Sequence, residues 1–202
     1  MKILVASDLH GELGRIRELV KKAKEENVDA ILIAGDLTHL ETKLEGIVGE
    51  LKKSGKRIIL IPGNEETNPT IDFLVNLYRP MIYNVHKSYF ILGNVGIIGV
   101  GGATKVGPNF LSEEEIFESL RENFEKIKDK KVKIVLVHEP PEIPELTLGF
   151  EANKKLVEFI KKYQPDILIC GHMHETFGKK VKVGKTLVIN PGPKGEIIEI
   201  ED

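Results

Sequence analysis

The chain has 202 residues, of which 41% are hydrophobic and 30% are charged, and its formal net charge is -2. This balance excludes a disordered tail, a collagen-like repeat and a strongly basic nucleic-acid coat, and it favours a soluble globular protein. No apolar run approaches the roughly 18 residues that cross a bilayer, so we expect no membrane-spanning segment. The single cysteine, Cys170, forms no internal disulfide, and the N-terminus turns polar early, which together predict a cytoplasmic location.

The charged residues are mainly lysine and glutamate. Only five of the 29 basic residues are arginine, and only seven of the 31 acidic residues are aspartate. Such enrichment is typical of hyperthermophile proteins and predicts a thermophilic protein. An ordinary solvated surface encoded by a Lys/Glu-rich genome would give the same composition, so both explanations stay open.

Short apolar runs alternate with longer amphipathic segments, which is the pattern of an α/β fold. The runs at 3–6, 30–34 and 57–61 are rich in aliphatic residues, as expected for parallel strands that are buried on both faces. The helices expected between and after these strands span residues 13–23, 40–53 and 68–78.

The second half of the chain is richer in strands. Runs at 88–92 and 95–101 meet at Gly93-Asn94, a dipeptide that suits a tight hairpin turn. Ser112 precedes three glutamates and fits the start of a helix that continues to about residue 127. The other expected elements are strands at 132–137 and 166–170, antiparallel strands at 180–183, 186–190 and 196–200, and a helix at 151–162. With no linker or repeat in the sequence, we expect one domain over residues 1–202.

Polar side chains that suit metal ions follow five of the predicted strands, each at the end of its strand. These groups are Asp8-Leu9-His10, Gly35-Asp36, Gly63-Asn64, His138, and Gly171-His172-Met173-His174. Asp8 and Asp36 lie 28 positions apart, as do Asp36 and Asn64, which is close to the length of one strand–helix–strand unit. Because ligands of parallel α/β sheets bind beyond the carboxyl ends of the strands, we expect all five ends to converge on one site.

Two aspartates, one asparagine and four histidines offer oxygen and nitrogen donors. They are too many for one tetrahedral ion and suit a pair of divalent ions (Mn, Fe, Ni or Zn) about 3.5 to 4 Å apart. Each motif alone has an ordinary alternative: Asp8 could cap a helix, and His138 could be a structural histidine. Their shared position, each behind a predicted buried strand, makes coincidence a poor explanation.

In this order the motifs resemble the calcineurin-like metallophosphoesterase superfamily, whose pattern runs D-x-H, G-D, G-N-H-(D/E), H and G-H-x-H. The resemblance implies a β-sandwich of mixed sheets flanked by helices. It also implies one metal held by Asp8, His10 and His174, a second held by Asn64, His138 and His172, and Asp36 as the bridge between them. Asn190-Pro191-Gly192 is similar to the Asn-Pro-Gly that follows the last motif in small members.

The implied activity is a metal-dependent phosphoesterase, a phosphodiesterase more than a monoesterase, acting on a small phosphorylated or nucleotide-type substrate. A hydroxide between two cations is available near neutral pH and can attack phosphorus in line, with Asp36, Asn64 and His138 at the reacting centre. The net charge of -2 gives no general attraction to phosphate polymers and disfavours nucleic acid as the substrate. We expect loops 102–110 and 140–150 to set specificity, and a homo-oligomer is compatible with so short a chain.

One residue departs from the family pattern, because Glu65 stands where the family has a histidine that is usually assigned to leaving-group protonation. A carboxylate near two cations is a poor acid, since they lower its pKa. Three consequences are open. Glu65 points away from the site, another residue such as His39 substitutes as the catalytic acid, or catalysis is lost and the chain is a metal-binding or scaffold module.

Overall fold

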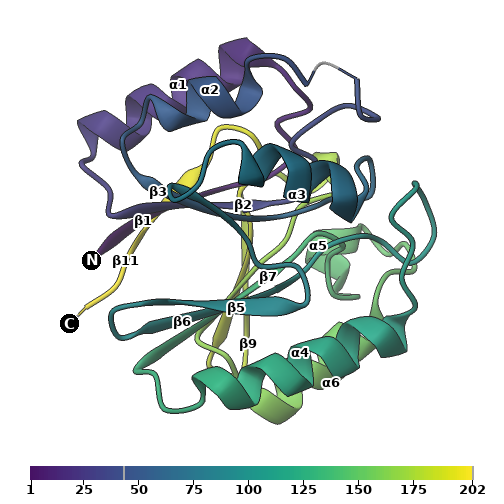
Figure 1. Cartoon of the computed structure of the whole chain (residues 1–202). Coiled ribbons are helices and arrows are strands. Elements are labelled where there is room, and N and C mark those ends of the chain that lie inside the picture. The colour runs from purple at the N-terminus through teal and green to yellow at the C-terminus, as the bar shows by residue number, and fades with distance from the viewer. Residues whose placement is uncertain (43, 202) are drawn as a thin grey trace.

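In the computed structural model, which describes residues 1–42 and 44–201, two β-sheets pack face to face and helices cover both outer faces (Figure 1). The five-stranded sheet consists of β1 (Lys2–Ala6), β2 (Ala30–Ala34), β3 (Arg57–Ile61), β4 (Ile82–Asn84) and β11 (Glu196–Glu199). Its spatial order is β11-β1-β2-β3-β4, with β1 to β4 parallel and β11 antiparallel to β1.

The six-stranded sheet has the order β5-β6-β7-β8-β10-β9. Its strands are β5 (Ser88–Leu92), β6 (Val95–Val100), β7 (Val132–Val137), β8 (Ile167–Ile169), β9 (Lys179–Val183) and β10 (Thr186–Asn190). The four central strands are parallel, and the two edge strands pair antiparallel to their neighbours. Both sheets are therefore mixed, as the sequence predicts.

Three helices pack on the first sheet and two long helices pack on the second. Those on the first are α1 (Leu13–Glu25), α2 (Ile47–Lys52) and α3 (Asn68–Asn76), and those on the second are α4 (Glu113–Ile127) and α6 (Lys154–Tyr163). The one-turn helix α5 (Pro144–Thr147) and the 3-10 turn η1 (His174–Thr176) lie in connections. None of the helices in the described part of the chain has the length and apolarity to cross a bilayer.

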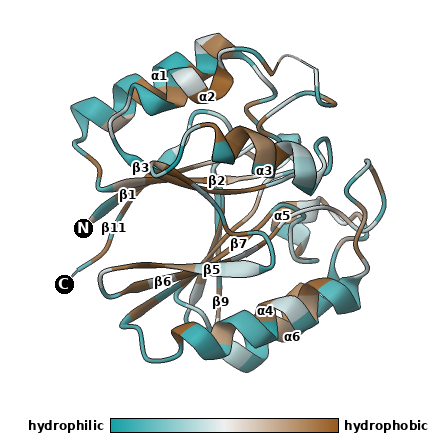
Figure 2. Cartoon of the chain, in the orientation of Figure 1, coloured by the Kyte–Doolittle hydropathy of each residue, from teal (hydrophilic) through white to brown (hydrophobic). Residues whose placement is uncertain are grey.

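The continuous apolar runs are explained by burial on both sides of the sheets. Ile3 and Val5 of β1 pack in the core between the sheets, whereas Leu4 packs under the helices of the first sheet. Figure 2 shows hydrophobic residues concentrated along the strands, with hydrophilic residues on the outer helices. Each fully buried Leu or Ile contributes roughly 1.5 to 3 kcal/mol relative to its exposed state, so these strands fix the sandwich.

The capping signal at Ser112 is confirmed. Its hydroxyl accepts a hydrogen bond from the backbone N–H of Glu115, and the Glu115 carboxylate accepts one from the backbone N–H of Ser112. This reciprocal arrangement satisfies two N–H groups at the start of α4 and is worth about 1 kcal/mol.

Two helix predictions need correction. Within the expected helix at 40–53, only Ile47–Lys52 is helical among the described residues, which leave out residue 43. Leu40 and Glu41 adopt positive φ angles of 48° and 57°, which a right-handed helix does not allow. The expected helix at 151–162 begins only at Lys154. Asn153 caps it by accepting a hydrogen bond from the backbone N–H of Leu156.

The last strand also differs from the expectation of a local antiparallel group at the C-terminus. β9 and β10 form a hairpin in the second sheet, but β11 crosses over to the edge of the first sheet. There Ile198 pairs with Ile3. The C-terminal end of the described chain thus closes the sheet that begins at the N-terminus.

Candidate metal centre

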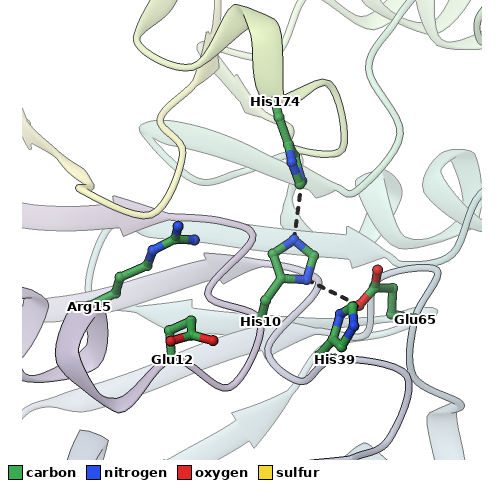
Figure 3. A pocket seen from close by; sticks show the side chains of 6 residues that line it. All are labelled: His10, Glu12, Arg15, His39, Glu65 and His174. Atoms are coloured by element: carbon green, nitrogen blue, oxygen red, sulfur yellow. Dashed lines mark hydrogen bonds and ion pairs between the residues drawn. The ribbon is translucent and has the colours of Figure 1, made fainter.

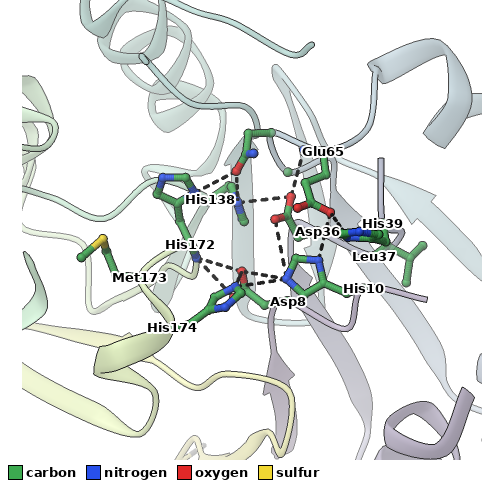
Figure 4. A network of polar contacts seen from close by, with 12 residues as sticks. Asp8, His10, Asp36, Leu37, His39, Glu65, His138, His172, Met173 and His174 are labelled. Carbon is green, nitrogen blue, oxygen red and sulfur yellow. Dashed lines mark hydrogen bonds and ion pairs between the residues drawn. The ribbon is translucent and has the colours of Figure 1, made fainter. Parts of the chain in front are cut away.

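The carboxyl ends of β1, β2 and β3 from one sheet and of β7 and β8 from the other meet at one edge of the sandwich. All seven predicted ligands lie there and form one connected cluster of side chains. Figure 4 labels all of them except Asn64, together with Glu65 and His39. The convergence predicted from the strand ends is therefore what the structure contains.

One group of donors is formed by Asp8, His10 and His174, whose ligand atoms lie within 4.8 Å of one another. The Nε2 atoms of His10 and His174 are 3.1 Å apart. Asp8 Oδ1 is 3.5 Å from His174 Nε2 and 4.0 Å from His10 Nε2. These three residues come from the ends of β1 and β8.

A second group surrounds the side-chain oxygen of Asn64. Asn64 Oδ1 lies 2.8 Å from His172 Nδ1 and 2.9 Å from His138 Nε2. Asp36 connects this group to the first one, since its Oδ1 is 3.3 Å from His138 Nε2 and its Oδ2 is 3.9 Å from His10 Nε2. The two oxygens of Asp36 thus face different donor groups.

The backbone at these positions is strained. Asp8, His10, Asp36 and His172 all have positive φ angles, of 56°, 48°, 50° and 68°. Non-glycine residues rarely adopt this region, and such strain costs on the order of 1 kcal/mol or more per residue. The tertiary structure therefore holds each of these residues in place against a cost in backbone free energy.

Nearby charge and hydrogen bonds favour ionised carboxylates at the centre, against the effect of burial. Asp8 is 0% exposed and Asp36 is 3% exposed. Burial alone would raise the pKa of both carboxyls, but the charge of His138 and hydrogen bonds from neighbouring histidines lower it instead. Burial likewise opposes charge on His138, yet the carboxylates of Asp36 and Asp8 raise its pKa. Two buried carboxylates beside four imidazoles form a donor set that fits divalent metal ions.

Glu66 supports the loops that carry two of the ligands. Its fully buried carboxylate accepts hydrogen bonds from the backbone N–H groups of Leu37, at 2.8 Å, and Gly63, at 3.2 Å. Burial and the charge of Asp36 raise the pKa of Glu66 to about 8. This residue stands in the sequence motif, but its role in joining the ends of β2 and β3 was not predicted.

The Asn-Pro-Gly segment supports the turn that carries His174. The side-chain amide of Asn190 donates hydrogen bonds to the carbonyl of Met173 and to the hydroxyl of Thr176, both at 2.9 Å. Asn190 is fully buried at the end of β10. It therefore fixes the residues on both sides of His174.

Glu65 does not point away from the site, so the first of the three expectations for this residue is wrong. Glu65 Oε2 accepts from Nδ1 of His10 at 3.1 Å and from Nδ1 of His39 at 3.0 Å. The backbone N–H of Glu65 donates to Asp36 Oδ1 at 3.1 Å. His39 has a half-exposed side chain, and its contact with Glu65 links it to the centre.

A cavity of about 350 Å³ opens onto the centre (Figure 3). Its walls are formed by His10, Glu12, Arg15, His39, Glu65 and His174. Glu12 and Arg15 were not singled out in the sequence, although their position just after the first ligand motif, where α1 begins, could have indicated them. Arg15 brings a permanent positive charge to this wall.

No residue of loops 102–110 and 140–150 is among those that line this cavity, and their role in specificity stays a prediction. Within the first loop, the side-chain amide of Asn109 donates a hydrogen bond of 2.9 Å to the carbonyl of Gly63, so the loop holds the backbone next to Asn64. The second loop borders a separate cavity of about 180 Å³.

Comparison with known proteins gives consistent results. The family model described as calcineurin-like phosphoesterase matches residues 1–176. An uncharacterised protein from Methanocaldococcus jannaschii is 30% identical, over 98% of this chain and 91% of that protein. A probable cyclic nucleotide phosphodiesterase from Vesicomyosocius okutanii is 25% identical, over 79% of this chain and 68% of that protein. The crystal structure of a protein from Thermus thermophilus superposes with a TM-score of 0.78 at 21% identity, covering 95% of this chain and 88% of that chain.

Proposed function

Because this chain belongs to the calcineurin-like phosphoesterase family, we propose that it is a metal-dependent phosphodiesterase acting on a small phosphate ester or nucleotide. The observation that carries this proposal is the position of Asp36, whose two carboxylate oxygens face two separate groups of donors. In the proposed enzyme, residues 1–202 act as one domain.

We assign the donors to two divalent ions. Asp8, His10 and His174 would hold one ion, Asn64, His138 and His172 would hold the other, and Asp36 would contact both. When bound, such ions supply Lewis acidity and a nucleophile at neutral pH. The chain itself supplies orientation: the Glu65 backbone N–H holds Asp36 Oδ1, and the strained backbone aims the other ligands inward.

The cavity residues favour a diester as the substrate. The carboxylate of Glu65 lies on the cavity wall and repels a dianionic monoester more strongly than a monoanionic diester. Arg15, on the same wall, can pair with the phosphoryl charge or with an anionic group of the ester. The similarity to a probable cyclic nucleotide phosphodiesterase supports this choice.

The proposed proton donor to the leaving group is His39. Its ring lies on the cavity wall with a half-exposed side chain, and its Nδ1 is held by Glu65 at 3.0 Å. This geometry leaves its other nitrogen without a hydrogen-bond partner among the described residues. His39 would thereby take over the task of the histidine that Glu65 replaces.

The test is hydrolysis of an aryl phosphodiester with added Mn²⁺, comparing the wild type with Asp36→Asn. We expect the wild type to be active and Asp36→Asn to lose at least about 100-fold, because replacing a metal ligand costs more than the 10- to 100-fold typical of groups that support ligands. Asp129→Asn is the matched control, since Asp129 is exposed and remote from the centre.

Absence of turnover with every divalent ion tried, or full activity of Asp36→Asn, would refute the proposal. Metal analysis of protein purified without chelator then separates the alternatives. Bound metal without turnover on any ester would identify the chain as a metal-binding scaffold.

A further inference from the structure

Glu65 contacts the ring nitrogen of His10 that points away from the donor groups. Among the described residues, no other carboxylate contacts that nitrogen. His10 Nδ1 lies 3.1 Å from Glu65 Oε2, while His10 Nε2 faces His174, Asp8 and Asp36. The two nitrogens of one imidazole therefore face two different environments, an anionic acceptor and the donor cluster.

This contact specifies where the ring proton lies. An ionised carboxylate accepts hydrogen bonds but has no proton to donate, so the proton in the hydrogen bond belongs to His10 Nδ1. Nε2 then keeps its lone pair, which is the form of imidazole that binds a metal. The Nε2 atoms of His10 and His174 lie 3.1 Å apart, a separation that suits two ligands of one ion.

The carboxylate itself is held in a fixed orientation. Oε2 of Glu65 also accepts from Nδ1 of His39 at 3.0 Å and from the backbone N–H of Leu40 at 3.3 Å. The Glu65 side chain is 18% exposed and that of His10 is 13% exposed, so water competes little for this contact. Donors from the loop after β2 thus fix an acceptor from the loop after β3.

A second histidine of the cluster is oriented in the same way, but by a different hydrogen-bond acceptor. His138 Nδ1 donates to the backbone carbonyl of Ala34 at 2.9 Å, and its Nε2 faces Asn64 and Asp36. In both cases the ring nitrogen that faces away from the cluster is bound by an oxygen. His10 differs because its acceptor carries a full negative charge, which raises the basicity of the imidazole.

We propose that Glu65 is a positioning residue that holds His10 in its Nδ1-protonated form and presents Nε2 to the metal ion. This role rests on the proposed function only in taking the donor cluster to be a metal centre. It gives the glutamate at the motif position a task other than donating a proton to the leaving group. His39 acts on the other side of the same carboxylate and keeps it turned toward His10.

The first test reads the tautomer directly in the metal-free protein. Nitrogen-15 NMR of the histidine rings at about pH 8, above the ordinary histidine pKa of about 6.5, should show His10 protonated on Nδ1. In Glu65→Ala the Nδ1-protonated population should fall, whereas Glu65→Gln, which keeps a neutral acceptor, should retain most of it. A wild-type His10 protonated on Nε2 would overturn the proposal.

The second test measures the affinity for Mn²⁺ alone by calorimetry, with no substrate present. We expect a 10- to 100-fold loss in Glu65→Ala and a smaller loss in Glu65→Gln, as is typical of groups that orient a metal-binding histidine. Glu175→Gln is the matched control. It removes an exposed carboxylate next to His174 that makes no contact with His10 among the described residues, so its affinity should stay within about 2-fold.

Wild-type affinity in Glu65→Ala, or an equal loss in Glu175→Gln, would show that Glu65 contributes no more than general charge. Should Glu65→Ala fail to fold, the wild-type tautomer and Glu65→Gln still decide the question. The expected tautomer and affinities without any esterase activity would refute the proposed function and leave this role of Glu65 intact. Esterase activity with an Nε2-protonated His10 would do the reverse.

Discussion

A methyl group on Gly63 would overlap the carboxylate of Asp36, because the backbone at the end of β3 lies directly against Oδ1 of that side chain. The close approach lets the Gly63 N–H bind Glu66 and places Asn64 beside the two histidines of its group. The absence of a side chain at position 63 is therefore a condition for the position of Asp36.

We predict that Gly63→Ala lowers Mn²⁺ affinity and phosphodiesterase activity by at least about 100-fold and destabilises the fold by about 1 to 3 kcal/mol, the usual cost of overpacking. Calorimetry and denaturant unfolding measure the two effects. Gly14→Ala is the control, since a Cβ at Gly14 meets nothing within 4 Å and α1 should gain up to about 1 kcal/mol. Normal metal binding in Gly63→Ala would contradict the close contact.

Asn190 should matter for the metal centre although it is no predicted ligand. Asn190→Ala removes both hydrogen bonds to the turn that carries His174 and leaves the Met173 carbonyl without this donor. We expect a loss of about 1 to 3 kcal/mol in unfolding free energy and a 10-fold or greater loss in Mn²⁺ affinity. Asn76→Ala, at an exposed position in α3, should change neither, and equal behaviour of the two variants would refute this role.

His86 should make the metal-free protein less stable in mild acid. Burial and the charge of Lys87 lower its pKa to about 4, and its Nδ1 accepts a 3.0 Å hydrogen bond from the Gly101 N–H. Between about pH 6.5 and pH 4 the unfolded chain binds a proton that the folded chain excludes, so stability falls as the pH falls, by at most about 3 kcal/mol. The pKa of His172 is also lowered to about 4 and acts in the same direction.

The comparison of wild type with His86→Gln isolates the contribution of His86. Urea unfolding at several pH values, with chelator present, should give a shallower pH dependence in the variant over this window. Parallel curves for the two proteins would show that His86 is not the group responsible.

We predict a thermal midpoint above about 60 °C, beyond most mesophilic domains. Lysine and glutamate side chains form linked ion pairs on the surface, such as those of Lys155 with both Glu114 and Glu158. Networks of this kind contribute more to stability at high temperature. Calorimetry of the metal-free protein measures the midpoint. A value below about 60 °C would favour the alternative that the composition reflects the genome alone.

Much of the fold and the meeting of the seven candidate donor residues at one edge could be predicted from the sequence, because the signals are local. β1, β2 and β3 are short apolar runs, each followed at once by a polar motif such as Asp8-Leu9-His10, and Ser112 with Glu115 encodes its own cap. Sequence spacing failed at 40–53, where positive φ angles that no apolar pattern reveals interrupt the expected helix.

Local patterns in the chain specify which strands are buried and which side chains follow them. The packing of the whole chain places β3 and β7 in opposite sheets, so that Asn64 and His138 meet across the sandwich at 2.9 Å. It also decided that Glu65 faces His10, and that Arg15 rather than a later loop lines the cavity. The physical reason is that these contacts join residues far apart in the chain, and their geometry is fixed by sheet packing rather than by local preference.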